Sequence, residues 1–420
     1  MGGVSMEWKH YKMDELIEEI SMGPFGSDVK KEFYVDNGVP ILNGSNLQGF
    51  KLKEDSFGYL TKEKADSLKK CNAHRGDIIV THRGTLGQIV YVPVNSKYDR
   101  YVISQSQFRF RCKADLVDVQ YLVYYFHTRE GQYKILANAS QVGVPALARA
   151  TSTFRLIDIK LPPLDDQRRI ASILSSLDRK IELNNKINAD LEEMAQAIFK
   201  NWFVDFEPFK DGKFVDSELG MIPEGWKVGR ADDFYQINIG KTPPRKEHKW
   251  FSTNPADKIW VSIANMGNSG IFISDSSEYL TKEAVDRHNI IMVPRNTILL
   301  SFKLTVGRVA IADKELTTNE AIARFILSDD KYMEYLYLYL KKYDYNSLGS
   351  TSSIATAVNS KTIKGMQMLQ PSDKIIDAFH IQVNPIFEKI RSLTKENSRL
   401  SLLRDTLLPR LMSGELEVPE

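Results

Sequence analysis

YLTKEKAD, at residues 59–66, returns almost unchanged as YLTKEAVD at residues 279–286, with six of eight positions identical in a chain of 420 residues. The match extends at the same offset of 220 residues, because GDIIVTHRGTLGQIVYV (76–92) aligns with NTILLSFKLTVGRVAIA (296–312). A period of this length is far too long for a solenoid repeat. The sequence therefore predicts a duplicated unit that consists of a domain and a linker.

Each globular copy mixes two kinds of pattern. The β-branched runs of residues 76–92, interrupted by glycine, are typical of two strands joined by a tight turn. YLVYYFHTRE (121–130), which aligns with YLYLYLKKYD (335–344) at an offset of 214, carries its apolar residues at helical spacing. We therefore expect an α+β fold for each copy.

A long stretch of helical character follows each copy. Residues 165–202 contain neither glycine nor proline, and apolar residues recur every seven positions there and again from residue 373 onward. The predicted seam positions are Ile170, Leu177, Asn184, Leu191 and Ile198 in the first stretch, and Ile386, Leu393, Leu400 and Leu407 in the second. The heptads predict two coiled-coil helices of about 40 residues, each roughly 60 Å long at 1.5 Å per residue.

The duplicated order predicts four segments. Residues 1–163 and 209–371 are the two similar domains, and residues 164–208 and 372–420 are the long spacer helices, the second with a C-terminal tail. If the helices pack antiparallel, a pseudo-twofold axis relates the copies, and the molecule is a spacer with two heads. Asn184 is an amide at an otherwise apolar seam position. It either fixes the register of the helices or lies in solvent near a frayed turn.

Composition places the chain among cytoplasmic globular proteins. The formal net charge is +2, and 42% of the residues are hydrophobic. The sequence has no apolar run long enough to span a membrane, and the first residues lack a secretory signal. The only cysteines are Cys71 and Cys112, without a CxxC motif, so we expect neither disulfides nor a metal site.

Several fragments imitate catalytic motifs without completing them. INIGKT (237–242) ends like a phosphate-binding loop, but Tyr235 stands where the first glycine is required, and Pro243 and Pro244 crowd the helix that should follow. No cluster of histidines, acids or lysines forms a nuclease or methyltransferase pattern. We expect a non-catalytic chain that binds no cofactor itself.

Three polar loops occupy equivalent places in both copies. GPFGSDVKKEFY (23–34) corresponds to GKTPPRKEHKWF (240–251), and polar turns also occur at residues 43–46 and 262–268 and within both strand–turn–strand segments. Such loops bring backbone amides, cations and side-chain amides to phosphates and base edges. A single loop of this kind is commonly only solvated, but its recurrence favours function. The predicted DNA-contacting residues are Ser27, Lys30, Lys31, Asn43, Ser45, Asn46, Thr81, His82 and Arg83 in the first copy, and Lys241, Thr242, Arg245, Lys246, Asn265, Asn268, Ser301, Lys303 and Arg308 in the second.

The whole chain resembles the specificity subunit of type I restriction–modification systems. The resemblance is carried by GPFGSDVKKEF (23–33), RGDIIVTHRGTLGQIVYV (75–92), LPPLDDQRRIASILSSLDRKIELNN (161–185) and FKNWFVDFEPF (199–209). It implies two target recognition domains, each reading one half of a bipartite site in double-stranded DNA. It also implies two methyltransferase subunits that methylate adenine N6 with S-adenosylmethionine. Restriction subunits that use ATP and Mg²⁺ to translocate and cleave DNA are the further partners implied.

Two other interpretations remain open at this point. A recognition subunit whose partner fuses methyltransferase and nuclease in one chain has the same features. A coiled-coil scaffold with two protein-binding heads has the same architecture without binding DNA.

Overall fold

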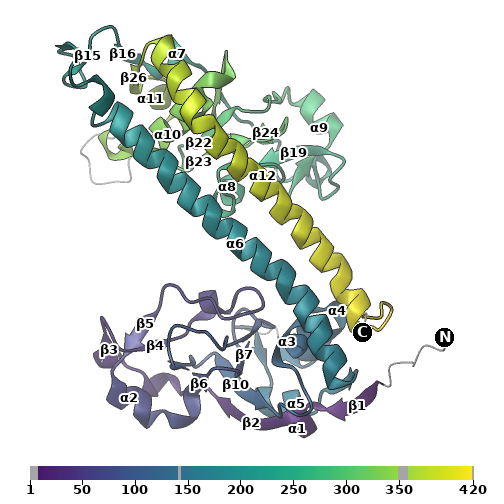
Figure 1. The fold of residues 1–420 in the computed structure, drawn as a ribbon. Coiled ribbons are helices and arrows are strands. Elements are labelled where there is room, and N and C mark those ends of the chain that lie inside the picture. Colours follow the sequence, from purple (N-terminus) through teal and green to yellow (C-terminus); the bar gives the residue numbers. More distant parts are fainter. Residues whose placement is uncertain (1–7, 141–142, 349–357, 419–420) are drawn as a thin grey trace. The chain divides into compact units, whose positions relative to one another are not determined.

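The computed structural model describes residues 8–140, 143–348 and 358–418 (Figure 1). The chain divides into two compact units, residues 1–181 with 398–420 and residues 182–397. Each long helix contributes residues to both units, because each domain packs against parts of both helices. The four segments expected from the sequence stay a prediction.

The described residues of unit 1 form two larger sheets and two antiparallel strand pairs, of which one is β11 (Ala139–Ser140) with β12 (Ala146–Leu147). The strands, in sheet order, are β2 (Ile17–Met22), β10 (Gln107–Cys112), β7 (Ile78–Thr81) and β8 (Ile89–Tyr91) in one sheet, and β3 (Tyr34–Val35), β5 (Gly58–Leu60), β4 (Val39–Ile41), β9 (Arg100–Val102) and β6 (Asn72–His74) in the other. A separate antiparallel pair, β1 (Lys9–Lys12) with β13 (Asp158–Leu161), joins the first and last strands of the domain. The chain therefore enters and leaves the domain at one place, where the long helix begins.

Unit 2 repeats this topology. Its strands, in sheet order, are β17 (Gln236–Ile239), β25 (Ile322–Ile326), β22 (Ile298–Ser301), β23 (Val309–Ala312) and β20 (Phe272–Ile273) in one sheet, and β18 (Phe251–Ser252), β21 (Tyr279–Leu280), β19 (Lys258–Val261) and β24 (Thr317–Thr318) in the other. β16 (Lys227–Arg230) pairs with β26 (Gln367–Gln370), as β1 pairs with β13. Even the parallel pairing recurs, because β4 with β9 corresponds to β19 with β24. The predicted α+β fold and internal repeat are confirmed.

The repeated octapeptide forms the end of a strand and the start of a helix. The Thr61 hydroxyl caps α2 (Lys62–Ser67) by accepting a hydrogen bond of 3.2 Å from the Lys64 amide. The Thr281 hydroxyl caps α9 (Lys282–Arg287) through the Ala284 amide at the same distance. The residues recur because threonine before a first helical turn satisfies an amide that would otherwise lack a partner.

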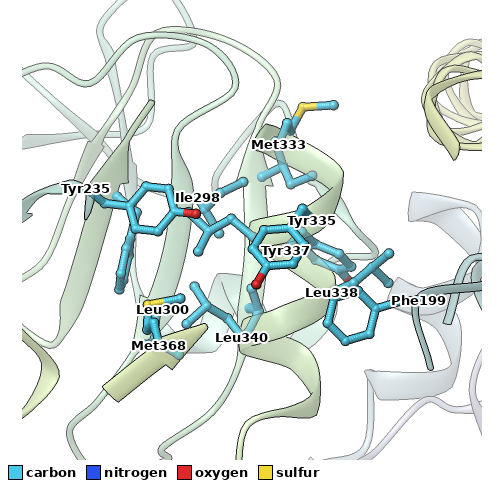
Figure 2. Packing of buried hydrophobic residues seen from close by; sticks show 14 of the residues in the cluster. Phe199, Tyr235, Ile298, Leu300, Met333, Tyr335, Tyr337, Leu338, Leu340 and Met368 are labelled. Atoms are coloured by element: carbon cyan, nitrogen blue, oxygen red, sulfur yellow. The ribbon is translucent and has the colours of Figure 1, made fainter. Parts of the chain in front are cut away.

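One helix in each domain completes the main core. The helices are α3 (Val119–His127) in unit 1 and α10 (Met333–Lys342) in unit 2, and both lie where the apolar spacing predicts them. In unit 2, Tyr335 and Tyr337 of α10 pack with Ile298 and Leu300 of β22 and with Phe199 of the long helix (Figure 2). Burial of this apolar surface is the main stabilising term for each domain.

The long helices are α6 (Leu164–Phe203) and α12 (Asp373–Met412), each of 40 residues. They run antiparallel in unit 2, because Asn184 contacts Glu396 and Asn397 whereas Trp202 lies 5.7 Å from Phe379 between ring centroids. Of the predicted seam residues, Ile170, Asn184 and Leu393 are buried, and Leu177, Leu191, Ile198, Ile386, Leu400 and Leu407 are half-buried. In the described part of the chain, no helix combines the length and apolarity needed to cross a membrane.

Asn184 has a structural role at the seam of unit 2. Its side chain is fully buried, and its amide donates hydrogen bonds of 3.0 Å to the Glu396 carboxylate and 2.8 Å to the Asn397 side chain. Asn397 in turn donates to Asn185 over 2.8 Å. A buried amide with polar partners on the facing helix favours one register over shifted ones. The structure therefore supports register-fixing over a solvated position.

Candidate nucleic-acid interface

In unit 1 the hairpin between β7 and β8 is tied to a neighbouring turn. The buried Thr81 hydroxyl donates to the Gln88 side chain over 3.0 Å. The amide of Gln88 then donates to the Gly44 carbonyl over 3.2 Å, in the 3₁₀ turn η3 (Gly44–Leu47). Two of the three predicted recognition loops are thereby held side by side.

The equivalent hairpin of unit 2, residues 301–308, is tied in the same way. The buried Ser301 hydroxyl donates to the Thr305 carbonyl over 2.6 Å and accepts from the Arg308 amide over 3.0 Å. The Arg308 guanidinium donates to the Ile263 carbonyl over 2.7 Å, in α8 (Ile263–Asn268). Arg308 therefore ties the hairpin of unit 2 to the neighbouring turn, as Gln88 does in unit 1.

The third loop of each domain begins at a glycine that approaches another backbone closely. A Cβ atom at Gly23 would lie 1.9 Å from the Ser104 carbonyl oxygen, and one at Gly240 would lie 1.9 Å from that of Asn319. Both loops therefore need glycine at this position for packing. In unit 1 the Gly23 amide donates to the Gln107 carbonyl over 2.8 Å, and the Gln107 side chain donates to the Asn43 carbonyl over 3.4 Å, so this loop lies beside the polar turn that begins at Asn43.

Several predicted side chains hold the loops themselves. Asn43 accepts a hydrogen bond of 2.8 Å from the Ser45 amide, and Asn265 accepts one of 2.9 Å from the Ser262 amide. Asn46 is fully buried, and its amide donates to the carbonyls of Lys53 and Asp55 over 3.0 and 2.7 Å. Its hydrogen-bond donors are already used, so this placement gives Asn46 a structural role and leaves no donor for a base edge.

Three predicted residues have special positions. His82 is half-buried with Nε2 3.2 Å from the Gln105 carbonyl oxygen, and burial lowers the pKa of its imidazole below the usual value. An uncharged ring at neutral pH does not offset a phosphate charge. The side chains of Ser27 and Asn268 lie outside the described part of the structure.

The exposed cations of the predicted loops differ in their surroundings. Lys30, Lys31 and Arg83 in unit 1, and Lys246 and Lys303 in unit 2, make no ion pair with another residue of the described ranges. Lys241 instead donates to the His288 carbonyl over 2.5 Å. These five side chains are therefore available to phosphate groups.

Arg245 is already engaged. Its guanidinium makes two hydrogen bonds of 2.8 and 3.0 Å to the Glu278 carboxylate. The group also lies over the rings of Phe251 and Trp260, 4.3 and 4.4 Å from their centroids. The hydrogen bond from Arg245 lowers the pKa of Glu278 despite partial burial. Bidentate pairing and stacking hold the arginine in one orientation.

A second carboxylate lies in the same surface. Thr242 donates a hydrogen bond to Glu320. Burial raises the pKa of Glu320, but the Thr242 bond and the nearby charges of Lys303 and Arg245 outweigh it, so the pKa is lowered overall. Glu278 and Glu320 were missed by sequence reasoning, because nothing in the local sequence marks a carboxylate as the partner of a loop far away in the chain.

A model of the type I restriction modification DNA specificity domain matches the chain twice, at residues 6–193 and 223–380. The chain belongs to this family, and the resemblance stated from its motifs is confirmed. It is 29% identical to the MjaIX specificity subunit of Methanocaldococcus jannaschii, over 100% of this chain and 96% of that one. It is 26% identical to the HindI specificity subunit of Haemophilus influenzae, over 98% and 100% of the two chains.

A solved structure supports the fold. The specificity subunit of the type I system of M. genitalium matches 97% of each chain with a TM-score of 0.57 at 15% identity. These comparisons favour neither the fused-partner system nor the protein-binding scaffold.

Proposed function

We propose that the chain is the DNA-recognition subunit of a type I restriction–modification complex, and that each domain reads one half of a bipartite target in double-stranded DNA. The observation that carries the proposal is that the family model matches twice, on two domains of one topology. Their frameworks agree while the tips of their loops differ, with Arg83–Gly84 in one hairpin and Lys303–Leu304 in the other. A shared scaffold with different loops is what the reading of two different half-sites requires.

In this proposal, one set of residues contacts the phosphates and another set contacts the bases. The exposed cations attract the duplex without regard to sequence, and Lys30 and Lys31 supply this attraction in the first domain. The hairpin tips and turns then lie where base edges can be read. The seam residues of α6 and α12 keep the helices in register and so serve as the spacer between the half-sites.

Catalysis belongs to other chains in this proposal. Two methyltransferase subunits would bind S-adenosylmethionine and methylate adenine, and restriction subunits would use ATP and Mg²⁺. The complex would act on DNA in the cytoplasm. The chain itself would neither methylate nor cut DNA without these partners.

An exchange of domains tests the proposal. Residues 209–371 are replaced by the equivalent segment of a relative, and the methylated sequence is mapped in cells that carry the matching methyltransferase and no other. We expect one half of the methylated motif to change and the other half to stay. A change in both halves would mean that the domains read DNA jointly. Absence of salt-sensitive DNA binding, with and without the partner, would instead support the scaffold.

A further inference from the structure

Leu304 lies at the tip of the hairpin between β22 and β23, and its position is unusual in two ways. Its side chain is 99% exposed, more than any other large hydrophobic residue in the described ranges. Its φ angle is +61°, in the left-handed region that bulky side chains rarely adopt. A leucine in this place adds nothing to packing and strains the backbone.

The first domain shows that the turn does not need leucine. The equivalent residue is Gly84, with φ +89° and no atom within 4 Å of the position of a Cβ atom. Glycine adopts this conformation without penalty. Strain that a simple substitution would relieve, and that stabilises nothing, points to a function of the side chain.

The tip is held firmly. The Gly307 amide donates to the Ser301 carbonyl over 3.0 Å, and the Thr305 amide donates to the Lys303 carbonyl over 2.7 Å. The Ser301 hydroxyl closes the same loop through the Thr305 carbonyl over 2.6 Å. The backbone that carries Leu304 is therefore held in one conformation, and little backbone freedom remains to be lost on binding.

The surroundings of the tip belong to the candidate interface. The Phe302 amide donates to the Ala321 carbonyl over 3.0 Å, which puts the hairpin beside the segment that contains Glu320. Lys303, adjacent to Leu304, is exposed and contributes to the lowered pKa of Glu320. An apolar side chain that projects beside an exposed cation suits a duplex, whose phosphates meet the cation while its bases offer apolar surface.

We propose that Leu304 is a specificity-determining residue of the second domain, and that its side chain makes an apolar contact with bases of the second half-site. The proposal rests on the proposed function and adds the contact to it. Two base surfaces share this chemistry, the 5-methyl group of thymine and the faces of a base step that is partly opened.

Three variants separate the side chain from the backbone. L304N keeps a residue of similar size that tolerates the left-handed conformation but is polar, and L304G removes the side chain and relieves the strain. L304M keeps an apolar side chain. Thermal unfolding of L304G and L304N should occur at or above the temperature of the parent, so loss of function cannot be ascribed to misfolding.

Binding and methylation are measured with the chain in its methyltransferase complex. We expect L304N and L304G to weaken binding of the cognate site about ten-fold and L304M to stay near the parent. The salt dependence should not change, because no phosphate contact is lost. The methylated motif should relax at one or two positions of the second half-site, while the first half-site, an internal control, keeps its bases.

Modified duplexes distinguish the two base surfaces. Deoxyuridine in place of each thymine of the second half-site removes only the methyl group. If that methyl group is the contact, this replacement should weaken binding by the parent and should not weaken binding by L304G. If a base step is opened, the fluorescence of 2-aminopurine placed in the second half-site should increase when the parent complex binds and should not increase with L304G. Parental affinity and motif in L304N and L304G would overturn the proposal, as would equal losses at both half-sites. Failure of the parent complex to bind any specific sequence would overturn the proposed function itself.

Discussion

The candidate recognition surfaces of the two domains share a framework and differ in charge. The tie from Gln88 to Gly44 in unit 1 corresponds to the tie from Arg308 to Ile263 in unit 2. Yet Lys30 and Lys31 stand exposed without an ion pair in the described ranges, whereas the Arg245 guanidinium is held by Glu278. Hydrogen bonds from one side chain to a neighbouring backbone therefore fix the loops in each domain, and the side chains at the loop tips are free to differ. If both surfaces bind DNA as proposed, Lys30 and Lys31 in the first and Lys246 and Lys303 in the second can meet phosphates directly, whereas Arg245 must first leave Glu278.

The largest expected effect is loss of the lysine pair in the first domain. Replacing Lys30 and Lys31 by alanine removes about two phosphate contacts, so the slope of log K against log salt should fall by about two. At 0.15 M salt this corresponds to binding weaker by about 30-fold for every sequence. The measurement is a salt titration of DNA binding by the methyltransferase complex.

Lys69 and Lys70 provide the matched control. They are also adjacent, exposed and in unit 1, but they lie outside the three loops. Alanine at both positions removes the same charge and should leave the slope unchanged. Equal losses in both double variants would show that general charge, and not the loop, attracts the DNA.

A change of opposite sign is expected in the second domain. Glu278→Gln removes the carboxylate charge that holds Arg245, whose guanidinium then becomes available to a phosphate. The salt slope should steepen by about one, and binding at 0.15 M salt should strengthen about five-fold. Glu224→Gln, at an exposed position of the same domain outside the three loops, removes an equal charge and is the control. Weaker binding by Glu278→Gln would mean that the ion pair positions Arg245 for recognition instead of restraining it.

Much of the fold follows from local sequence patterns. Heptads predicted α6 and α12, helical spacing predicted α3 and α10, and glycine between β-branched runs predicted both hairpins. These features are local, since periodicity and caps act within a few turns.

The surface chemistry was less predictable. Asn46 resembles a base-reading amide in the sequence, but its side-chain amide already donates its hydrogen bonds to the carbonyls of Lys53 and Asp55. Arg245 meets Glu278 only through the pairing of β18, β21 and β19, which brings distant parts of the chain together. Partners separated by many residues depend on tertiary structure, so the sequence of the loop cannot reveal which cation is neutralised. The DNA contacts of the individual residues remain predictions.

The smallest expected effect is on the pH dependence of stability in the two domain cores. It concerns the C-terminal ends of α3 and α10. His127 is half-buried with Nε2 2.9 Å from the Ile89 carbonyl oxygen, whereas its counterpart Lys341 is exposed. Burial lowers the pKa of His127 below the ordinary value of about 6.5, with the charge of Arg404 acting in the same direction and the Ile89 bond and Asp178 opposing. The unfolded chain therefore takes up the proton at higher pH than the folded one.

Because of this difference, the contribution of His127 to the stability of unit 1 is fully present above about pH 6.5 and is lost as the pH falls toward the folded pKa. Glu334 of α10 contributes in the opposite direction, since burial raises its pKa and the contact with His380 only partly offsets this.

We expect amide hydrogen exchange, corrected for its intrinsic pH dependence, to show protection of α3 falling more than that of α10 between pH 7 and 5.5. His127→Gln keeps a donor and cannot titrate, so it should flatten the response of α3, while His10→Gln, at an exposed position of the same unit, should not. The same pH response in His127→Gln and the parent would show that another group of unit 1 carries the acid sensitivity.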